Sequence, residues 1–243
     1  MEATRGAPRR RPAGQRLTAL IAGASGLVGG ECLRRLVVQP RYAEVIVLTR
    51  RDLGALARGP KVRQVICDFA ELGRRRAELA ADHVFCTLGT TIRKAGSREK
   101  FREVDFEYPL RLAQLTRMHG AKHFSIVSAS GASRSSPFFY SRVKGEVEQG
   151  LGGMDWPSLA ILRPSVIAGE RGESRPLERL AVKLLSAAPA RWRSVAAADI
   201  AAAMVAIALE SPPGTTVVES SEIPSRAARL PRERAGAGGA ENE

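Results

Sequence analysis

The chain has 243 residues, of which 44% are hydrophobic and 26% charged, a composition that suits one folded domain and excludes a disordered or fibrous protein. It contains no run of about 18 uncharged apolar residues, so we expect no transmembrane helix and no membrane partner. The three cysteines are scattered and predict neither a disulfide framework nor a thiolate metal cage. We therefore expect no bound metal, and a reducing, cytoplasmic location.

The formal charge of +13 comes almost wholly from arginine, which supplies 32 of the 38 basic residues. A basic surface is one mark of nucleic-acid binding. Aromatic residues make up only 5% of the chain, and no basic stretch interleaves them for stacking on bases. The charge therefore indicates a general use of arginine in place of lysine, and a nucleic-acid partner is not expected.

The two ends differ from the rest of the chain. Residues 1–16 hold five arginines and resemble a targeting signal, but the apolar run that follows is interrupted by glycines that fit a binding turn better. We predict a disordered basic arm over residues 1–16. Residues 224–243, rich in Arg, Ala, Gly and Glu, are predicted as a disordered tail, and residues 17–223 as a single domain.

Within this domain, short apolar runs alternate with amphipathic stretches. The predicted strands are 17–22, 44–49, 62–67, 83–87, 123–127, 158–162 and 215–219. The predicted helices are 27–38, 71–80, 98–119, 137–151 (capped by Ser136, with Pro137 first), 177–187 and 197–210. Near-continuous apolar strands separated by helices indicate a doubly wound parallel sheet, an α/β fold of the Rossmann type.

A glycine turn joins the first predicted strand to the first helix. Gly23 permits the tight turn, Gly26 lets the backbone approach a diphosphate, and Gly29 lets the helix pack against the strand. The helix N-terminus then faces the anion. Because no Gly-Lys-Ser/Thr sequence follows, a P-loop for nucleoside triphosphates is excluded. The predicted cofactor contacts of this turn are Gly23, Ser25, Gly26, Leu27, Val28 and Gly29.

The end of the second strand indicates which dinucleotide binds. Arg50 and Arg51 stand about 20 residues after the glycines, where NAD-selective enzymes usually place an acid. Guanidinium groups suit a 2′-phosphate, and Asp52 comes too late to contact the ribose. We therefore predict NADP(H) as the preferred cofactor, with NAD(H) as the alternative. Asp68 and Phe69, after the third strand, would flank the adenine.

A second constellation combines Tyr140 and Lys144, which share one helix face at a spacing of four residues. A free tyrosine has a pKa of about 10, and a neighbouring ammonium group favours its phenolate. An exposed helical pair without function is the alternative. The position of the pair in the chain favours a catalytic role, because Ser128 ends the preceding strand at the carboxyl edge of the sheet, where ligands bind in such folds.

These motifs together resemble the short-chain dehydrogenase/reductase superfamily in its atypical extended branch. Further stretches are similar to the Tat-interactive-protein-like NADPH-binding oxidoreductases: 88–91, 94–96, 104–105, 140–148, 163–164 and 173–176. The resemblance implies diphosphate contacts from Ser25 to Val28, 2′-phosphate contacts at Arg50 and Arg51, cofactor contacts at Leu88, Gly89, Tyr140, Lys144, Ile167 and Arg175, and catalysis by Tyr140, Lys144 and Ser128. Asp105 departs from the pattern, since many superfamily members use an asparagine near this place.

The leading hypothesis is an NADPH-dependent oxidoreductase that reduces a small carbonyl compound. Tyr140 would protonate the developing alkoxide, Ser128 would hydrogen-bond the carbonyl oxygen, and Lys144 would hold the ribose and poise Tyr140. A catalytically weak NADPH-sensing regulatory protein that acts through protein contacts is the alternative. The predicted helices 98–119 and 137–151 are candidate faces of a homodimer.

Overall fold

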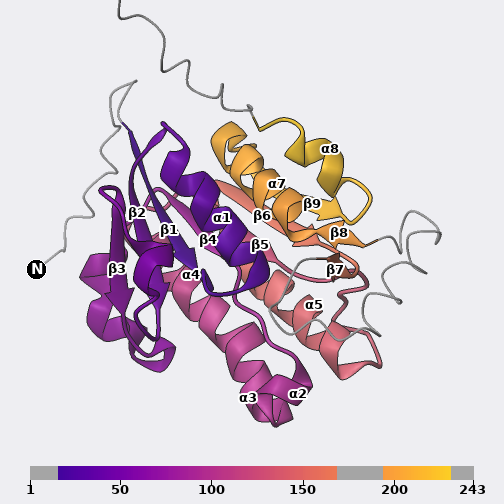
Figure 1. Cartoon of the computed structure of the whole chain (residues 1–243). Coiled ribbons are helices and arrows are strands. Elements are labelled where there is room, and N and C mark those ends of the chain that lie inside the picture. Colours follow the sequence, from indigo (N-terminus) through magenta and orange to yellow (C-terminus); the bar gives the residue numbers. More distant parts are fainter. Residues whose placement is uncertain (1–15, 169–193, 231–243) are drawn as a thin grey trace, which may run out of the picture.

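A single sheet of seven parallel strands forms the centre of the protein in the computed structural model, which describes residues 16–168 and 194–230 (Figure 1). The strands are β1 (Leu17–Ala22), β2 (Tyr42–Thr49), β3 (Val62–Ile66), β4 (His83–Cys86), β5 (His123–Val127), β6 (Ser158–Arg163) and β9 (Gly214–Glu219). Their order across the sheet is β3-β2-β1-β4-β5-β6-β9. This order confirms the predicted doubly wound fold, with a switch in winding direction between β1 and β4.

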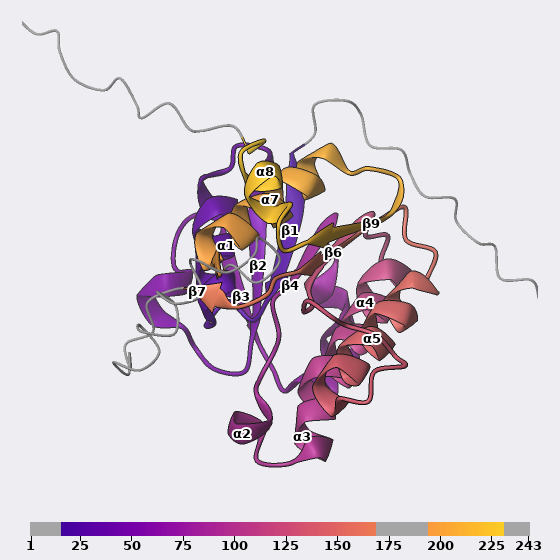
Figure 2. The ribbon, with the colours of Figure 1, turned by 90° about the vertical axis from the view of Figure 1, so that its right-hand side faces the viewer.

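Helices cover both faces of the sheet (Figures 1 and 2). One face carries α1 (Leu27–Val38), α7 (Ala197–Glu210) and α8 (Ile223–Ala227). The other face carries the 3₁₀ helix η2 (Phe69–Leu79), α4 (Tyr108–Met118) and α5 (Phe139–Gly152). Two short helices, α2 (Ile92–Ala95) and α3 (Arg98–Arg102), project beyond the carboxyl edge of the sheet. The short 3₁₀ helix η1 (Gly54–Ala57) follows β2.

The central strands are apolar on both sides because each face of the sheet packs against helices. In β1, Leu20 belongs to the core under α4 and α5, whereas the next residue, Ile21, belongs to the core under α1 and α7. Burial of one such side chain contributes about 1.5–3 kcal/mol. The alternation of faces fixes the register of β1, and with it the position of the turn that follows.

Two predicted helices differ from the observed ones. The stretch 71–80 forms the 3₁₀ helix η2, which begins at Phe69. The predicted helix 98–119 is divided into α3, a π-helical turn (Glu103–Glu107) and α4. Pro109 explains the widened turn, because proline has no N–H to bond the carbonyl four residues earlier and its ring clashes with that group.

Other boundaries also need correction. Helix α5 begins at Phe139, and the Ser136 hydroxyl oxygen accepts a hydrogen bond from the Phe138 N–H, so Ser136 stabilises the preceding turn and does not cap the helix. The tail predicted from residue 224 is wrong as far as residue 230, because α8 occupies its start and Ile223 is fully buried.

A second sheet was not predicted. It pairs two short strands, β7 (Ile167–Ala168) and β8 (Val195–Ala196), in parallel. The predicted helix 177–187, the arm as far as residue 15 and the last 13 residues of the tail lie outside the described residues. Within the described ranges, no helix combines the length and the apolar character needed to cross a lipid bilayer.

Candidate functional site: a cleft at the carboxyl edge of the sheet

The glycine turn lies at the carboxyl end of β1, in close contact with the residue after β4. Gly23 has a φ of +92°, and a Cβ added there would lie 2.7 Å from the backbone of Thr87. A Cβ at Gly29 would lie only 2.1 Å from the carbonyl oxygen of Gly23. Since real Cβ atoms do not approach a backbone oxygen so closely, α1 can reach β1 in this way only with glycine at position 29.

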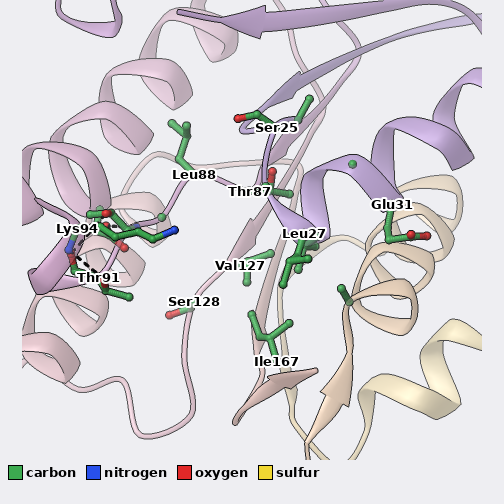
Figure 3. Close-up of a pocket in the computed structure, with 18 of the residues that line it drawn as sticks. Ser25, Leu27, Glu31, Thr87, Leu88, Thr91, Lys94, Val127, Ser128 and Ile167 are labelled. Carbon is green, nitrogen blue, oxygen red and sulfur yellow. Dashed lines mark hydrogen bonds between the residues drawn. The ribbon is translucent and has the colours of Figure 1, made fainter. Parts of the chain in front are cut away.

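Two adjoining cavities, of about 1130 and 640 Å³, occupy the cleft. They share a wall that includes Ser25 and Gly26 of the glycine turn and Leu88 and Gly89 of the loop after β4. Figure 3 shows the larger cavity between the turn, this loop and the segment that carries Val127 and Ser128. An elongated cleft with small residues at its centre and arginines at one end fits a phosphorylated dinucleotide.

Most of the predicted site residues line this cleft. The larger cavity is lined by Ser25, Gly26, Leu27, Val28, Arg50, Leu88, Gly89, Ser128, Tyr140, Lys144 and Ile167. The smaller cavity is lined by Gly23, Ser25, Gly26, Arg50, Arg51, Leu88 and Gly89. Gly29 and Asp68 line neither, and Arg175 lies outside the described residues.

The smaller cavity is positively charged where β2 ends. Arg50 and Arg51 are exposed, and neither guanidinium forms an ion pair with another described residue. Asp52 does not line either cavity. Its carboxylate accepts hydrogen bonds from the Gln64 side chain at 2.8 Å and from the Gly54 N–H at 2.9 Å. The side chains that remain available to an anion here are therefore cationic.

An aromatic pair, the predicted Phe69 and the unpredicted Tyr108, forms another wall of the smaller cavity. The Phe69 and Tyr108 rings stack with their centroids 5.4 Å apart, and both residues line the cavity. The Asp68 carboxylate instead accepts a hydrogen bond from the Ala70 N–H at 2.9 Å and caps η2. The wall contact expected of Asp68 is thus made by its neighbour, Phe69. Phe69 thus lies where it was expected, whereas Asp68 does not line the cavity.

Lys144 and Tyr140 lie on α5 as the spacing predicts, but Lys144 has a partner of its own. The lysine side chain is 5% exposed, and its Nζ lies 2.7 Å from Oδ1 of Asp105. The other Asp105 oxygen accepts a hydrogen bond from the Thr90 N–H at 2.9 Å. Burial disfavours the charged lysine, but the charge of Asp105, the charge of a Tyr140 phenolate and the hydrogen bond to Asp105 together raise the pKa of Lys144. Lys144 therefore remains an ammonium ion.

Tyr140 lies one helical turn before Lys144, at the mouth of the larger cavity. It is 39% exposed, and its ring packs on Phe101 with the centroids 5.6 Å apart. The arrangement places an accessible phenol close to a buried cation whose charge is balanced by a carboxylate. Asp105 belongs to the stretches on which the family resemblance rests, but its ion pair with Lys144 was not predicted.

Ser128 belongs to a buried hydrogen-bond network. Its hydroxyl donates to Oε1 of Glu148, on α5. Glu148 also accepts two hydrogen bonds from Arg163, at 3.1 Å from Nε and 2.6 Å from a terminal nitrogen. The other terminal nitrogen of Arg163 donates to Glu219 at 2.9 Å. The single hydroxyl proton of Ser128 is therefore directed at Glu148, which differs from the predicted hydrogen bond to a carbonyl oxygen.

The remaining candidate groups take no part in the cleft. Burial raises the pKa of the Cys86 thiol to about 12, so this residue is not a nucleophile near neutral pH. His83 and His123 lie at the amino ends of β4 and β5, away from the cavities. In the part of the chain that the structure describes, no three His, Cys, Asp or Glu residues gather in a way that could hold a metal ion.

Comparison with known proteins identifies relatives of this fold and sequence. The NAD dependent epimerase/dehydratase family matches residues 19–137. Protein HTATIP2 of Rattus norvegicus is 38% identical over 182 residues, which cover 74% of this chain and 75% of that protein. The mitochondrial protein fmp52 of Emericella nidulans is 33% identical over 166 residues, or 66% of this chain and 71% of the relative.

Solved structures share the fold at low sequence identity. The Bordetella bronchiseptica enzyme WbmH in complex with NAD⁺ matches with a TM-score of 0.67 and 17% identity, over 85% of this chain and 76% of that one. The UDP-Glc/GlcNAc 4-epimerase of Campylobacter jejuni matches with a TM-score of 0.64 and 17% identity, over 86% and 82%. The architecture is thus the NAD(P)-binding Rossmann fold of extended short-chain dehydrogenases/reductases. The chain belongs to the Tat-interactive-protein-like family.

Proposed function

We propose that the protein is an NADPH-dependent oxidoreductase that reduces a small carbonyl compound. One observation carries the proposal: the glycine turn, Tyr140 and Lys144 all line one cavity of about 1130 Å³. A dinucleotide held at the turn would therefore extend toward a phenol that can donate a proton. Arg50 and Arg51 at the other end of the cleft support NADPH over NADH.

Some of these residues would bind the cofactor, and Tyr140 would transfer a proton. When bound, NADPH would supply a hydride to the carbonyl carbon. Tyr140 would donate its proton to the oxygen on which negative charge develops, and its exposure at the cavity mouth leaves it accessible to substrate. Lys144, held by Asp105, would bind the nicotinamide ribose and stabilise the phenolate left on Tyr140. Ile167 would help to exclude water from the nicotinamide end.

The experiment that tests this function measures NADPH oxidation by the purified chain across a panel of small ketones and aldehydes. The Tyr140→Phe variant keeps the ring that packs on Phe101 but loses the proton, so we expect a fall in kcat of at least about 100-fold with NADPH affinity unchanged. Unchanged turnover in this variant would contradict the assignment of Tyr140.

A second candidate function is a regulatory protein that senses NADPH and turns over slowly or not at all. The specific observation in its favour is that the two residues predicted to act beside Tyr140 already have polar partners, Lys144 with Asp105 and Ser128 with Glu148. Tight NADPH binding without turnover on any panel member, together with a protein partner recovered from cells, is the result that favours it.

Location and assembly belong to the same proposal. We expect a cytoplasmic protein whose partners are a small-molecule substrate and a second copy bound through α4 and α5, with no membrane or nucleic-acid partner. The fmp52 relatives are named mitochondrial, so cell fractionation is the decisive measurement of location. Native mass spectrometry would measure the subunit number.

A further inference from the structure

The Ser128 hydroxyl has one proton, and the network around it fixes where that proton points. Glu148 accepts two hydrogen bonds from the Arg163 guanidinium, a group that does not lose its charge in proteins. A carboxylate in such a pair is ionised, and an ionised carboxylate only accepts hydrogen bonds. Ser128 is therefore the donor in its contact with Glu148.

The network leaves the serine little freedom to turn. Its own N–H donates to the carbonyl oxygen of Leu162 at 2.7 Å, which holds the backbone. Arg163 is held on its far side by Glu219, and the hydrogen bonds that it donates to Glu148 raise the pKa of the guanidinium. Ser128 and Glu148 are both less than a tenth exposed, so water does not compete for the contact. Only the lone pairs of the serine oxygen remain for a group that enters the cavity.

We propose that Glu148 is a positioning residue that makes Ser128 a hydrogen-bond acceptor toward the cavity, and that the site selects carbonyl compounds with a hydroxyl group beside the carbonyl. The inference rests on the proposed carbonyl reduction. A plain ketone offers only an acceptor and leaves Ser128 without a partner. In a hydroxyketone, the carbonyl oxygen accepts from Tyr140 while the neighbouring hydroxyl donates to Ser128.

A pair of ketones of nearly equal shape tests the preference. In 3-hydroxy-3-methylbutan-2-one a hydroxyl replaces one methyl of 3,3-dimethylbutan-2-one, and as a tertiary alcohol it cannot itself be oxidised. We expect kcat/KM for the hydroxyketone to exceed that for the plain ketone by about tenfold, the scale of one neutral hydrogen bond together with the unpaired group it would leave. Equal values, or a preference for the plain ketone, would overturn the proposal.

Matched variants assign the preference to the network. Glu148→Gln and Glu219→Gln each remove one carboxylate from Arg163, but only the first contacts Ser128. An amide at position 148 is a weaker acceptor and can donate to the serine oxygen, so we expect this variant to lose the hydroxyketone preference. Glu219→Gln retains it. Ser128→Ala, which disturbs no ion pair, also loses the preference, and a preference that survives in Ser128→Ala contradicts the role of the serine.

Ligand binding without turnover separates this inference from the proposed function. The two ketones are titrated into the chain loaded with NADP⁺, where no hydride is available for reduction, and their Kd values are compared by calorimetry. A parent chain that reduces no ketone contradicts the proposed function. If it still binds the hydroxyketone about tenfold more tightly, the inference about Ser128 stands, whereas equal Kd values overturn it even in an active enzyme.

Discussion

The two edges of the central sheet both hold buried polar groups, but they satisfy them in opposite ways. At the carboxyl edge the groups are ionised and paired, as in Lys144 with Asp105. At the amino edge they are neutral: His83 Nδ1 contacts the Tyr42 hydroxyl at 2.9 Å, and the ring nitrogens of His123 contact two serine hydroxyls. Burial lowers the pKa of both histidines, to about 4 for His83 and about 3 for His123.

The difference follows from what each edge faces. At the amino edge the two buried histidines have hydroxyl groups as hydrogen-bond partners, and a neutral network avoids the cost of a buried charge. The carboxyl edge opens into the cleft, where a ligand can contact the Lys144 ammonium group, whose charge Asp105 already balances. A buried ion pair contributes little to stability compared with an apolar replacement, which indicates that Lys144 and Asp105 are placed for the ligand. Changing one edge at a time separates the two effects.

The largest effect is expected from breaking the ion pair at the carboxyl edge. Asp105→Asn keeps an acceptor for the Thr90 N–H but leaves the buried Lys144 charge without a partner, so we expect a loss of about 3–5 kcal/mol in the free energy of unfolding. Urea denaturation measures it. The control is Glu44→Ala, which removes an exposed pair with Arg63 and should cost less than about 1 kcal/mol. Equal losses in the two variants would contradict the burial argument.

The next effect is a loss of stability in acid that arises at the amino edge. Because the folded-state pKa values of His83 and His123 lie below the usual 6.5, the unfolded chain binds more protons as pH falls. Their contribution is complete above pH 6.5 and is lost as pH falls toward 4, by about 2 kcal/mol for each histidine at pH 5. Urea denaturation between pH 7 and pH 5 measures the slope.

His119 provides the control for this pH dependence, because it is exposed and lies outside the buried network. His119→Gln should leave the slope between pH 7 and pH 5 unchanged, whereas His123→Asn should reduce it. A slope that does not change in the His123 variant would show that other groups cause the acid sensitivity.

A smaller effect, about 1–3 kcal/mol, is expected from adding one methyl group to the glycine turn. Gly29→Ala places a Cβ 2.1 Å from the Gly23 carbonyl oxygen, so the helix must shift and the cofactor turn with it. Gly30→Ala, one residue later in α1, meets no atom closer than 3.6 Å and should stabilise the helix by about 0.5–1 kcal/mol. Thermal unfolding and NADPH titration of the two variants measure the contrast. Similar behaviour of the two would contradict the packing role of Gly29.

The sheet could be predicted from the sequence because its strands are short apolar runs, and all seven of its strands lie where such runs occur. The pairing of Asp105 with Lys144 could not. Asp105 lies in a π-helical turn, so the 3.6-residue period used to assign helix faces does not apply to it. Glu148 and Arg163 come from α5 and β6, and no sequence pattern indicates that they meet under Ser128.

The smallest effect concerns the two ends of one strand. Arg51 follows β2 at the carboxyl edge and lines the smaller cavity, whereas Arg41 precedes the same strand at the amino edge and lines neither cavity. If Arg51 binds a 2′-phosphate, Arg51→Gln should weaken NADPH binding by about tenfold, the loss of one charge-assisted contact in an exposed setting, and leave NADH binding unchanged. Arg41→Gln should change neither affinity, because Arg41 lines neither cavity. Both variants lower the net charge by one, so a difference between them depends on the position of the arginine. Fluorescence titration of the nicotinamide measures the four affinities. An equal loss of NADPH affinity in both variants would mean that the general charge of the protein, and not the carboxyl edge of β2, attracts the cofactor.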